Sequence, residues 1–208
     1  MSPAMQNAAF EACGLNWVYL PLLVEKGRLA DALKGLVALG FAGANVTAPY
    51  KQEAAELCES DLPSVNTLVV KDGRIESHST DTAILDGLPA KRPAIVGGGG
   101  TAAAFRVALP HARMFSRRGN WPPDVVEADL VVNATSERKE VVVRVEKGQT
   151  LIDLPYPETA TGRAAREAGA TVVTGLEVLA AQGAAAFQLW TGMNPPVDAM
   201  RAALGLTA

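Results

Sequence analysis

The feature that most constrains this chain is a glycine-rich loop between an apolar segment that predicts a strand, residues 94–96, and a helix-forming segment, residues 102–109. The loop consists of Gly97, Gly98, Gly99, Gly100 and Thr101. Side chains beside a pyrophosphate would block the backbone amides that point at it from a helix N-terminus. A tight structural turn is the alternative for a bare glycine cluster. The strand before the loop and the helix after it favour nucleotide binding.

The residues after the next predicted strand, at 112–115, indicate whether the domain binds NAD or NADP. A domain that binds NAD usually places an acidic residue there for the ribose hydroxyls. This chain instead has Ser116, Arg117 and Arg118. Because a guanidinium group suits a 2′-phosphate, the sequence predicts NADP as the cofactor.

Strand-like and helix-like segments alternate along the chain, which predicts an α/β protein built on a parallel sheet. Leu29, Leu33 and Leu36 recur at helical spacing before Gly40, which is typical of a helix end. Asp72-Gly73 predicts a tight turn between strands at 66–70 and 75–78. Further strands are expected at 44–46, 130–132 and 150–152, and a long helix at 176–190.

Composition narrows the functional class. The chain has 208 residues, 49% of them hydrophobic, and a net charge of −3 without long blocks of one sign. The even spread of charge leaves no basic segment of the kind that binds nucleic acid or a membrane surface, so neither is expected as a partner. A small molecule is the expected partner. With no leader-like start and no apolar run long enough for a bilayer, we expect a cytoplasmic protein. Cys13 and Cys58 lack the close spacing of metal or redox pairs and are expected to be reduced thiols.

Two charged residues are ambiguous when considered alone. Lys51 ends the segment Asn-Val-Thr-Ala-Pro-Tyr-Lys, in which Pro49 prevents further strand pairing and lets polar groups gather at a strand end. An isolated Lys51 is most simply an exposed, solvated lysine. Asp81 lies in Ser-Thr-Asp-Thr, which can open a helix, and is most simply an N-cap.

Taken together, the motifs resemble the shikimate dehydrogenase family, in collinear order over essentially the whole chain. The matching segments are residues 2–7 (Ser-Pro-Ala-Met-Gln-Asn), 45–51, 65–67 (Val-Asn-Thr), 79–81 (Ser-Thr-Asp), 97–102, 133–136 (Asn-Ala-Thr-Ser), 153–156 (Asp-Leu-Pro-Tyr) and 182–192. The resemblance implies an α/β substrate-binding catalytic domain at 1–88 and a reduced, Rossmann-like NADP-binding domain at 89–175. A C-terminal helical segment at 176–208 would return to the substrate domain.

The resemblance also implies the chemistry, which is reversible reduction of 3-dehydroshikimate to shikimate by NADPH in aromatic amino acid biosynthesis. Lys51 and Asp81 would form the catalytic pair. An ordinary lysine is protonated at neutral pH and needs a neighbouring carboxylate to share its proton. The substrate's carboxylate and ring hydroxyls would bind Ser2, Thr47, Asn66 and Gln182. The cofactor site would add Thr135 and Gly175 to the glycine loop and to Ser116, Arg117 and Arg118.

The sequence departs from the family's pattern in three places. The family's earlier serine ahead of Ser2 is missing, Glu137-Arg138-Lys139-Glu140 replaces a Gly-Met pair expected near the nicotinamide, and the connection 117–129 is short. Only residues 122–127 could form one or two helical turns there. These departures leave three alternatives open: a quinate or aminoshikimate dehydrogenase, a catalytically impaired descendant that still binds a ligand, and a pure NADP-binding module. The presence of Lys51 and Asp81 argues against a pure NADP-binding module. A homodimer is possible, and the sequence leaves the oligomeric state open.

A further expectation concerns the start of the chain. The family's serine-proline segment follows a central strand of the substrate domain, and Met1 stands where the family often has leucine, some codons of which also initiate translation. Neighbouring strands without that partner would carry unpaired backbone groups, each costing about 1–3 kcal/mol when buried. We predict that a chain extended upstream by a strand and its turn melts at a higher temperature and binds shikimate more tightly. Indistinguishable melting curves, with and without shikimate, would contradict this.

Overall fold

The computed structural model describes residues 1–206, which divide into two compact units. The first unit contains residues 1–81 and the chain from Ala180 onward, and the second contains Thr82–Leu179. The chain therefore leaves the first unit once and returns to it. None of the helices in residues 1–206 combines the length and apolar character that crossing a membrane requires. Cys13 and Cys58 are free thiols.

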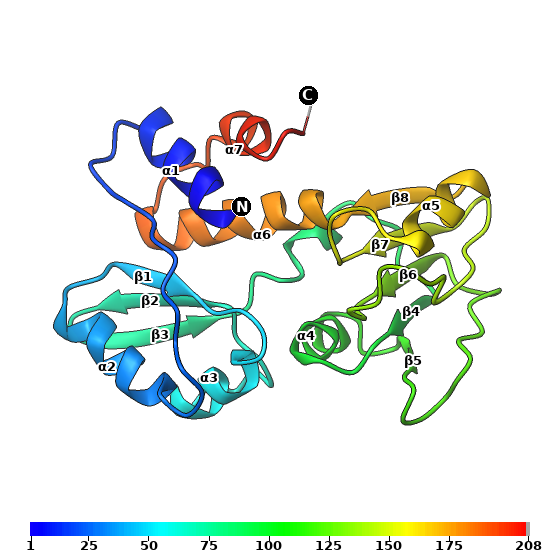
Figure 1. The fold of residues 1–208 in the computed structure, drawn as a ribbon, viewed down its shortest axis with the longest axis horizontal. Coiled ribbons are helices and arrows are strands. Elements are labelled where there is room, and N and C mark those ends of the chain that lie inside the picture. The colour runs from blue at the N-terminus through cyan, green and yellow to red at the C-terminus, as the bar shows by residue number, and fades with distance from the viewer. Residues whose placement is uncertain (207–208) are drawn as a thin grey trace. The chain divides into compact units, whose positions relative to one another are not determined.

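The first unit contains a small antiparallel sheet in the order β1-β2-β3 (Figure 1). Its strands are β1 (Gly43–Asn45), β2 (Thr67–Lys71) and β3 (Arg74–His78). Asp72 and Gly73 adopt positive φ angles of 51° and 73° between β2 and β3, so the predicted tight turn is confirmed. The helices α2 (Leu29–Ala38) and α3 (Lys51–Leu57) supply apolar residues to the same core cluster as Leu68 of β2. Gly40, at φ 70°, ends the α2 segment as expected.

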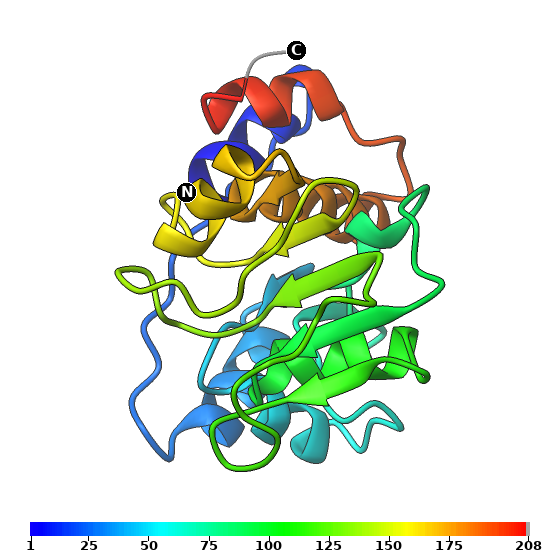
Figure 2. The same cartoon turned by 90° about the vertical axis from the view of Figure 1, so that its right-hand side faces the viewer.

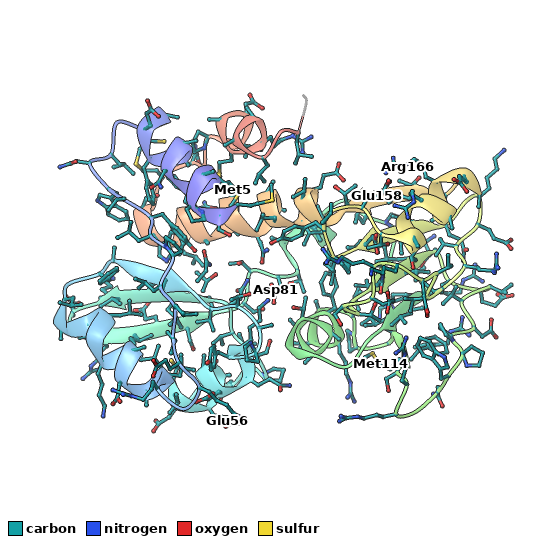
Figure 3. All side chains as sticks on the ribbon, viewed as in Figure 1. Met5, Glu56, Asp81, Met114, Glu158 and Arg166 are labelled. Atoms are coloured by element: carbon teal, nitrogen blue, oxygen red, sulfur yellow. The ribbon has the colours of Figure 1, made fainter. Side chains whose placement is uncertain are left out.

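Three further helices complete this unit: α1 (Ser2–Ala12), α6 (Gly175–Thr191) and α7 (Val197–Ala203). The part of α6 after Ala180 belongs here. Phe10 of α1 packs on Phe187 of α6 with ring centroids 5.8 Å apart. Where α1 approaches α6, the end of the Met5 side chain (labelled in Figure 3) fills the space that a Cβ at position 183 would occupy, so a side chain there would have to displace it. Trp190 Nε1 donates to the Leu68 carbonyl at 2.9 Å and ties α6 to β2.

The second unit is built on a five-stranded, fully parallel sheet in the order β5-β4-β6-β7-β8 (Figure 2). The strands are β4 (Pro93–Val96), β5 (Arg113–Phe115), β6 (Leu130–Asn133), β7 (Thr150–Asp153) and β8 (Thr171–Thr174). All residues of β4, β6 and β7 are buried, as expected for a parallel sheet covered on both faces. The chain goes from β4 to β5 on one side and then to β6 on the other, which makes β4 the switch point of the topology.

Helices and loops share the task of covering this sheet. One face packs against α4 (Gly100–Ala108) and the 3₁₀ turn η1 (Ala83–Leu85), and the other against α5 (Ala160–Glu167). Residues 116–129 and 134–149, described in full, contain no helix, so the predicted turns at 122–127 are absent. Loop side chains replace a helix on that face: Val125, Ala128, Val142, Val143 and Val145. This unit can therefore do without helices in two of its connections, because apolar loop residues cover the strands directly.

The start of α5 generates a prediction about stability. Thr159, which is fully buried, accepts a hydrogen bond from Gly162 N at 2.9 Å and donates one to Asp153 Oδ2 at 2.6 Å. Thr159→Ala should remove an N-cap and a donor to a buried carboxylate, at a combined cost of about 2–3 kcal/mol. Burial raises the pKa of Asp153 and the Thr159 hydroxyl opposes that rise, so the loss should grow as pH increases and the carboxylate ionises.

Urea unfolding at acidic and neutral pH measures this effect. Thr171→Ala, at an exposed position of β8, is the matched control and should change stability little. Equal losses in the two variants, or a loss independent of pH, would show that the Thr159 hydroxyl does not serve this role.

Candidate active site

A shielded ion pair joins Lys51 and Asp81 in the first unit. Lys51 is the first residue of α3, and Asp81, labelled in Figure 3, comes shortly after β3. Lys51 Nζ lies 2.8 Å from Asp81 Oδ1 and 2.7 Å from Oδ2, so both carboxylate oxygens accept from the ammonium group. The two side chains are only 13% and 4% exposed. Lys51 is therefore not the solvated lysine of the simpler interpretation.

Asp81 is not a helix cap either. The helical turn that follows is the 3₁₀ turn η1, and its N-cap residue, Thr82, makes no side-chain capping bond. A helical turn does begin after residues 80–82, as predicted, but Asp81 does not cap it, because Thr80 and Asp81 direct their polar groups to Asn66 and Lys51 instead.

Asn66 connects this pair to α6. Its Nδ2 donates to Asp81 Oδ1 and to Gln182 Oε1, each at 3.0 Å. Its Oδ1 accepts the backbone N–H of Thr80 at 2.7 Å, which fixes which end of the amide is oxygen because a backbone N–H can only donate. Lys51, Asp81, Asn66 and Gln182, predicted from separate motifs, thus form one hydrogen-bonded cluster.

Ser2 and Thr47 belong to the same unit. Ser2 is the first residue of α1 and is half-buried, while Thr47 is exposed in the turn before α3, where its carbonyl accepts the Tyr50 N–H at 3.0 Å. Their predicted contacts with substrate stay predictions.

The sequence analysis missed other polar residues around Asn66. Thr67 and Thr80 are buried, and their hydroxyls lie 3.1 Å apart and within 3.2 Å of Asn66 Oδ1. Asn45 donates to Thr67 Oγ1 at 3.0 Å and accepts from the Tyr19 hydroxyl at 3.0 Å. Thr67, Thr80 and Asn45 lie inside the quoted motifs, so their motif positions could have identified them, whereas Tyr19 carries no such indication.

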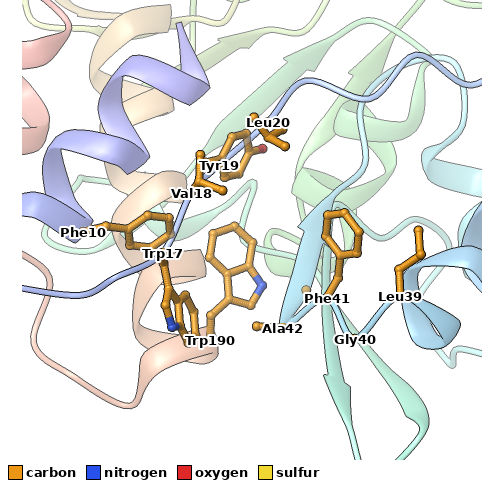
Figure 4. Close-up of a pocket in the computed structure, with 11 residues that line it drawn as sticks. Phe10, Trp17, Val18, Tyr19, Leu20, Leu39, Gly40, Phe41, Ala42 and Trp190 are labelled. Atoms are coloured by element: carbon orange, nitrogen blue, oxygen red, sulfur yellow. The ribbon is translucent and has the colours of Figure 1, made fainter.

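An apolar cavity of about 330 Å³ lies beside Tyr19 (Figure 4). Its walls come from the segment 17–20, from residues 39–43, and from Phe10 and Trp190. The Tyr19 and Trp190 rings are 6.0 Å apart and form part of this wall. The sequence did not predict this cavity, because its lining comes from four separate segments.

The glycine loop of the second unit follows β4 and leads directly into α4. Gly97 has φ 139°, and a Cβ there would lie 2.6 Å from the Ala134 carbonyl oxygen, so only glycine fits. Gly98 and Gly99 are exposed, and a Cβ at Gly99 would meet nothing within 4 Å. The loop therefore leaves open space ahead of the α4 N-terminus, which is the arrangement that binds a phosphate group.

A hollow of about 430 Å³ lies at the carboxyl ends of β4, β6 and β7. Its lining comprises Thr101, Ala134, Thr135, Ser136, Arg138, Leu154, Pro155 and Tyr156. Dinucleotides bind at this edge of doubly wound sheets, next to the switch point. The structure thus brings the predicted residues Thr101 and Thr135 together. Gly175, at the start of α6, is buried against the Leu154 carbonyl, where a side chain would not fit.

The basic turn after β5 is open to solvent. Arg117 and Arg118 are exposed, and the turn is closed by the Gly119 N–H, which donates to the Ser116 carbonyl at 2.9 Å. The Arg117 guanidinium carbon lies 5.7 Å from the centroid of the Trp121 ring, within cation–π range. Two cationic side chains are therefore available next to the strand that follows the glycine loop.

The segment that replaces the family's Gly-Met pair folds around Glu137. The carboxylate accepts the N–H groups of Lys139, Arg138 and Glu140, which together lower the pKa of Glu137. Arg138 donates to the Tyr156 carbonyl at 3.3 Å and lines the 430 Å³ hollow. Arg138 thus gives this hollow a cationic wall residue.

Among the comparisons with known proteins, the family models match mainly the first unit, and whole-length relatives cover both units. The family model for the shikimate dehydrogenase substrate binding domain matches residues 1–68, and that for the shikimate 5′-dehydrogenase C-terminal domain matches residues 175–204. Shikimate dehydrogenase (NADP(+)) of Anaeromyxobacter sp. (strain Fw109-5) is 36% identical over 252 aligned positions, covering 98% of this chain and 90% of that protein. The alignment is longer than the 208-residue chain, so that relative carries residues that this chain lacks.

Two further similarities also cover nearly the whole chain. Shikimate dehydrogenase (NADP(+)) of Moorella thermoacetica is 37% identical, covering 96% of this chain and 86% of that protein. The crystal structure of shikimate 5-dehydrogenase from Thermus thermophilus in complex with shikimate is 31% identical, with a TM-score of 0.83 over 98% of this chain and 92% of that one. These similarities, which extend over nearly the whole sequence, show that the chain belongs to the shikimate dehydrogenase family.

Proposed function

We propose that this protein catalyses the reversible, NADP-dependent reduction of 3-dehydroshikimate to shikimate. The observation that carries the proposal is the shielded Lys51–Asp81 pair, hydrogen-bonded through Asn66 to Gln182. Relatives named NADP-dependent shikimate dehydrogenases support it. In this proposal the first unit binds the substrate and the second binds the cofactor.

The second unit has the features that a dinucleotide requires. Residues 97–101 would receive the pyrophosphate at the α4 N-terminus, and Arg117 and Arg118 would face the 2′-phosphate. When bound, NADP supplies or accepts the hydride, so the protein contributes position and charge. The open space beside Gly99 and the exposure of both arginines fit this group.

The Lys51–Asp81 pair would handle the proton. During reduction, negative charge develops on the substrate's carbonyl oxygen, and the Lys51 ammonium donates a proton to it. During oxidation, the same nitrogen must accept the hydroxyl proton. Asp81 compensates the charge of Lys51 and, through both of its oxygens, fixes the position of Nζ. Because the pair is largely shielded from water, each of these interactions is stronger than it would be at the surface.

The substrate would be oriented by groups from different elements of the first unit. Asn66 lies beside Asp81, and Gln182 lies beside Asn66. These two amides would bind ring hydroxyls, the Asn66–Gln182 bond giving way to the substrate, while the Ser2 and Thr47 hydroxyls would bind the substrate carboxylate and a hydroxyl. A position in aromatic amino acid biosynthesis, a cytoplasmic location and a homodimer belong to the same proposal.

The direct test is the absorbance of NADPH after shikimate and NADP are added to the protein. We expect NADPH to form with shikimate faster than with quinate or aminoshikimate. A faster reaction with either analogue would reassign the substrate, and a flat trace with all three would favour a descendant that binds a ligand without turning it over.

The assignment of Lys51 generates a first prediction. Lys51→Ala should lower kcat by about 10²- to 10⁴-fold, with a smaller change in KM, because general acid–base catalysis contributes about this much. Lys34→Ala, which removes an exposed lysine from α2, is the matched control and should leave kcat unchanged. Thermal melts establish that both variants are folded. A folded Lys51→Ala protein with the original kcat would end this assignment.

The basic turn generates a second prediction. Replacing Arg117 and Arg118 together by alanine should weaken NADP far more than NAD, because only NADP carries the 2′-phosphate. Titration of both cofactors into the variant measures the ratio of the two dissociation constants. Arg144 and Arg163, both exposed in the same unit, give a control double variant with the same loss of charge. Equal weakening of NADP and NAD would show that Arg117 and Arg118 serve another purpose.

A further inference from the structure

A series of hydrogen-bonded side chains leads from the Lys51–Asp81 pair into the interior of the first unit, and Thr67 is at its centre. The Thr67 hydroxyl accepts from Asn45 Nδ2 at 3.0 Å, lies 3.2 Å from Asn66 Oδ1 and lies 3.1 Å from the Thr80 hydroxyl. Thr67 is 0% exposed, so a substrate cannot reach it. Its hydroxyl can therefore influence the reaction only through its neighbours.

The neighbour that matters is the Asn66 amide. Its Nδ2 donates to Asp81 Oδ1, while its Oδ1 accepts the Thr80 N–H and faces the two threonine hydroxyls. If the amide turned over, its oxygen would face the Asp81 carboxylate and its NH₂ group would face the Thr80 N–H. Both contacts would be repulsive. The Thr80 hydroxyl lies 3.1 Å from Nδ2 and 3.2 Å from Oδ1 and so does not distinguish the two orientations, whereas the Thr67 hydroxyl, which already accepts from Asn45, favours the observed one by donating to Oδ1.

The series continues to Tyr19. Asn45 also donates to the Asn66 carbonyl at 3.1 Å, and its own Oδ1 accepts from the Tyr19 hydroxyl. Burial raises the pKa of Tyr19 to about 12, so this hydroxyl keeps its proton at neutral pH.

Tyr19 is itself fixed, although it lies outside regular secondary structure. The Asn7 side chain holds its backbone, accepting from Tyr19 N at 2.7 Å and donating to Tyr19 O at 3.1 Å. Its ring packs 6.0 Å from that of Trp190 (Figure 4). The far end of the series therefore has an anchored donor.

We propose that Thr67, Asn45 and Tyr19 are positioning residues: they hold the Asn66 amide in the orientation that donates to Asp81, and so keep Asp81 and Lys51 aligned for proton transfer. The catalytic half of this inference rests on the proposed function. The orientation of the Asn66 amide does not, and it can be measured without substrate.

The central test is Thr67→Val, which keeps the branched shape that suits a strand and removes only the hydroxyl. We expect kcat for shikimate to fall about 10- to 100-fold, more than KM rises, because misplaced catalytic groups lose rate steeply. Thr67→Ser, which restores the hydroxyl, should recover most of this loss. If the Thr67 hydroxyl contributed only to stability, Thr67→Val would lower the melting temperature without changing kcat of the folded protein, and this result would overturn the proposal.

A second variant covers the case in which Thr67→Val does not fold. Tyr19→Phe removes the terminal hydroxyl and keeps the ring, and should lower kcat in the same direction by a smaller factor. Tyr50→Phe is the matched control, because the Tyr50 hydroxyl donates to the Val24 carbonyl at the same distance of 3.0 Å, outside the series. Equal kcat in Tyr19→Phe, Tyr50→Phe and the unaltered protein would overturn the role of Tyr19.

Nuclear magnetic resonance of the Asn66 side-chain amide provides a readout independent of activity. Its two hydrogens, identified by their loss in Asn66→Asp, should exchange with solvent faster in Thr67→Val and Tyr19→Phe than in Thr67→Ser and Tyr50→Phe. If the unaltered protein does not oxidise shikimate but this pattern appears, the proposed function fails and the positioning of Asn66 stands. If shikimate is oxidised while exchange and kcat are unchanged in Thr67→Val, the inference is overturned and the function stands.

Discussion

The ion pair between Lys51 and Asp81 is the constraint on which the rest of the first unit depends. Removing two charges from water costs several kcal/mol for each ion, and their attraction offsets this only when further hydrogen bonds satisfy the remaining groups. Here the Asn66 amide supplies such a bond, and the Thr80 backbone, one residue before Asp81, is held by the same amide. The positions of α3, β2 and the chain after β3 are therefore coupled through side chains whose arrangement is also the one that proton transfer needs.

In the second unit the main constraint is the crossover that each pair of parallel strands needs. A parallel strand pair requires a crossover of about a dozen residues, and most such crossovers contain a helix. Two of the four crossovers here are loops, and their valines cover the sheet face that a helix would otherwise cover. The strand ends keep their positions, since β4, β6 and β7 are paired in register along their whole lengths. The hollow at their carboxyl ends is therefore kept even though the unit is reduced.

Local sequence patterns predicted much of this structure for physical reasons that act over a few residues. Glycine at 97 is required by a positive φ and a close carbonyl, Asp72-Gly73 by a tight turn, and Leu29, Leu33 and Leu36 by one helix face. The interpretation of Asp81 as an N-cap was wrong because a local capping pattern was considered without its distant partners, Lys51 and Asn66. The predicted helical turns at 122–127 were wrong for a similar reason, because whether a short apolar segment becomes a helix depends on the surface against which it packs.

The sequence by itself determined the strands β1 to β7, the helices α2, α4 and α6, the glycine loop with its arginines, and the collinear motifs that indicated the family and the pairing of Lys51 with Asp81. Only the tertiary structure decided which end of the Asn66 amide faces Asp81, that Thr67 and Asn45 support it, and that Tyr19 is the anchored end of the series. The reason is the range of the interactions. Turns, helix faces and loops depend on neighbours in sequence, whereas Asn66 meets Gln182 across 116 residues, so their hydrogen bond exists only once β2 and α6 have packed together.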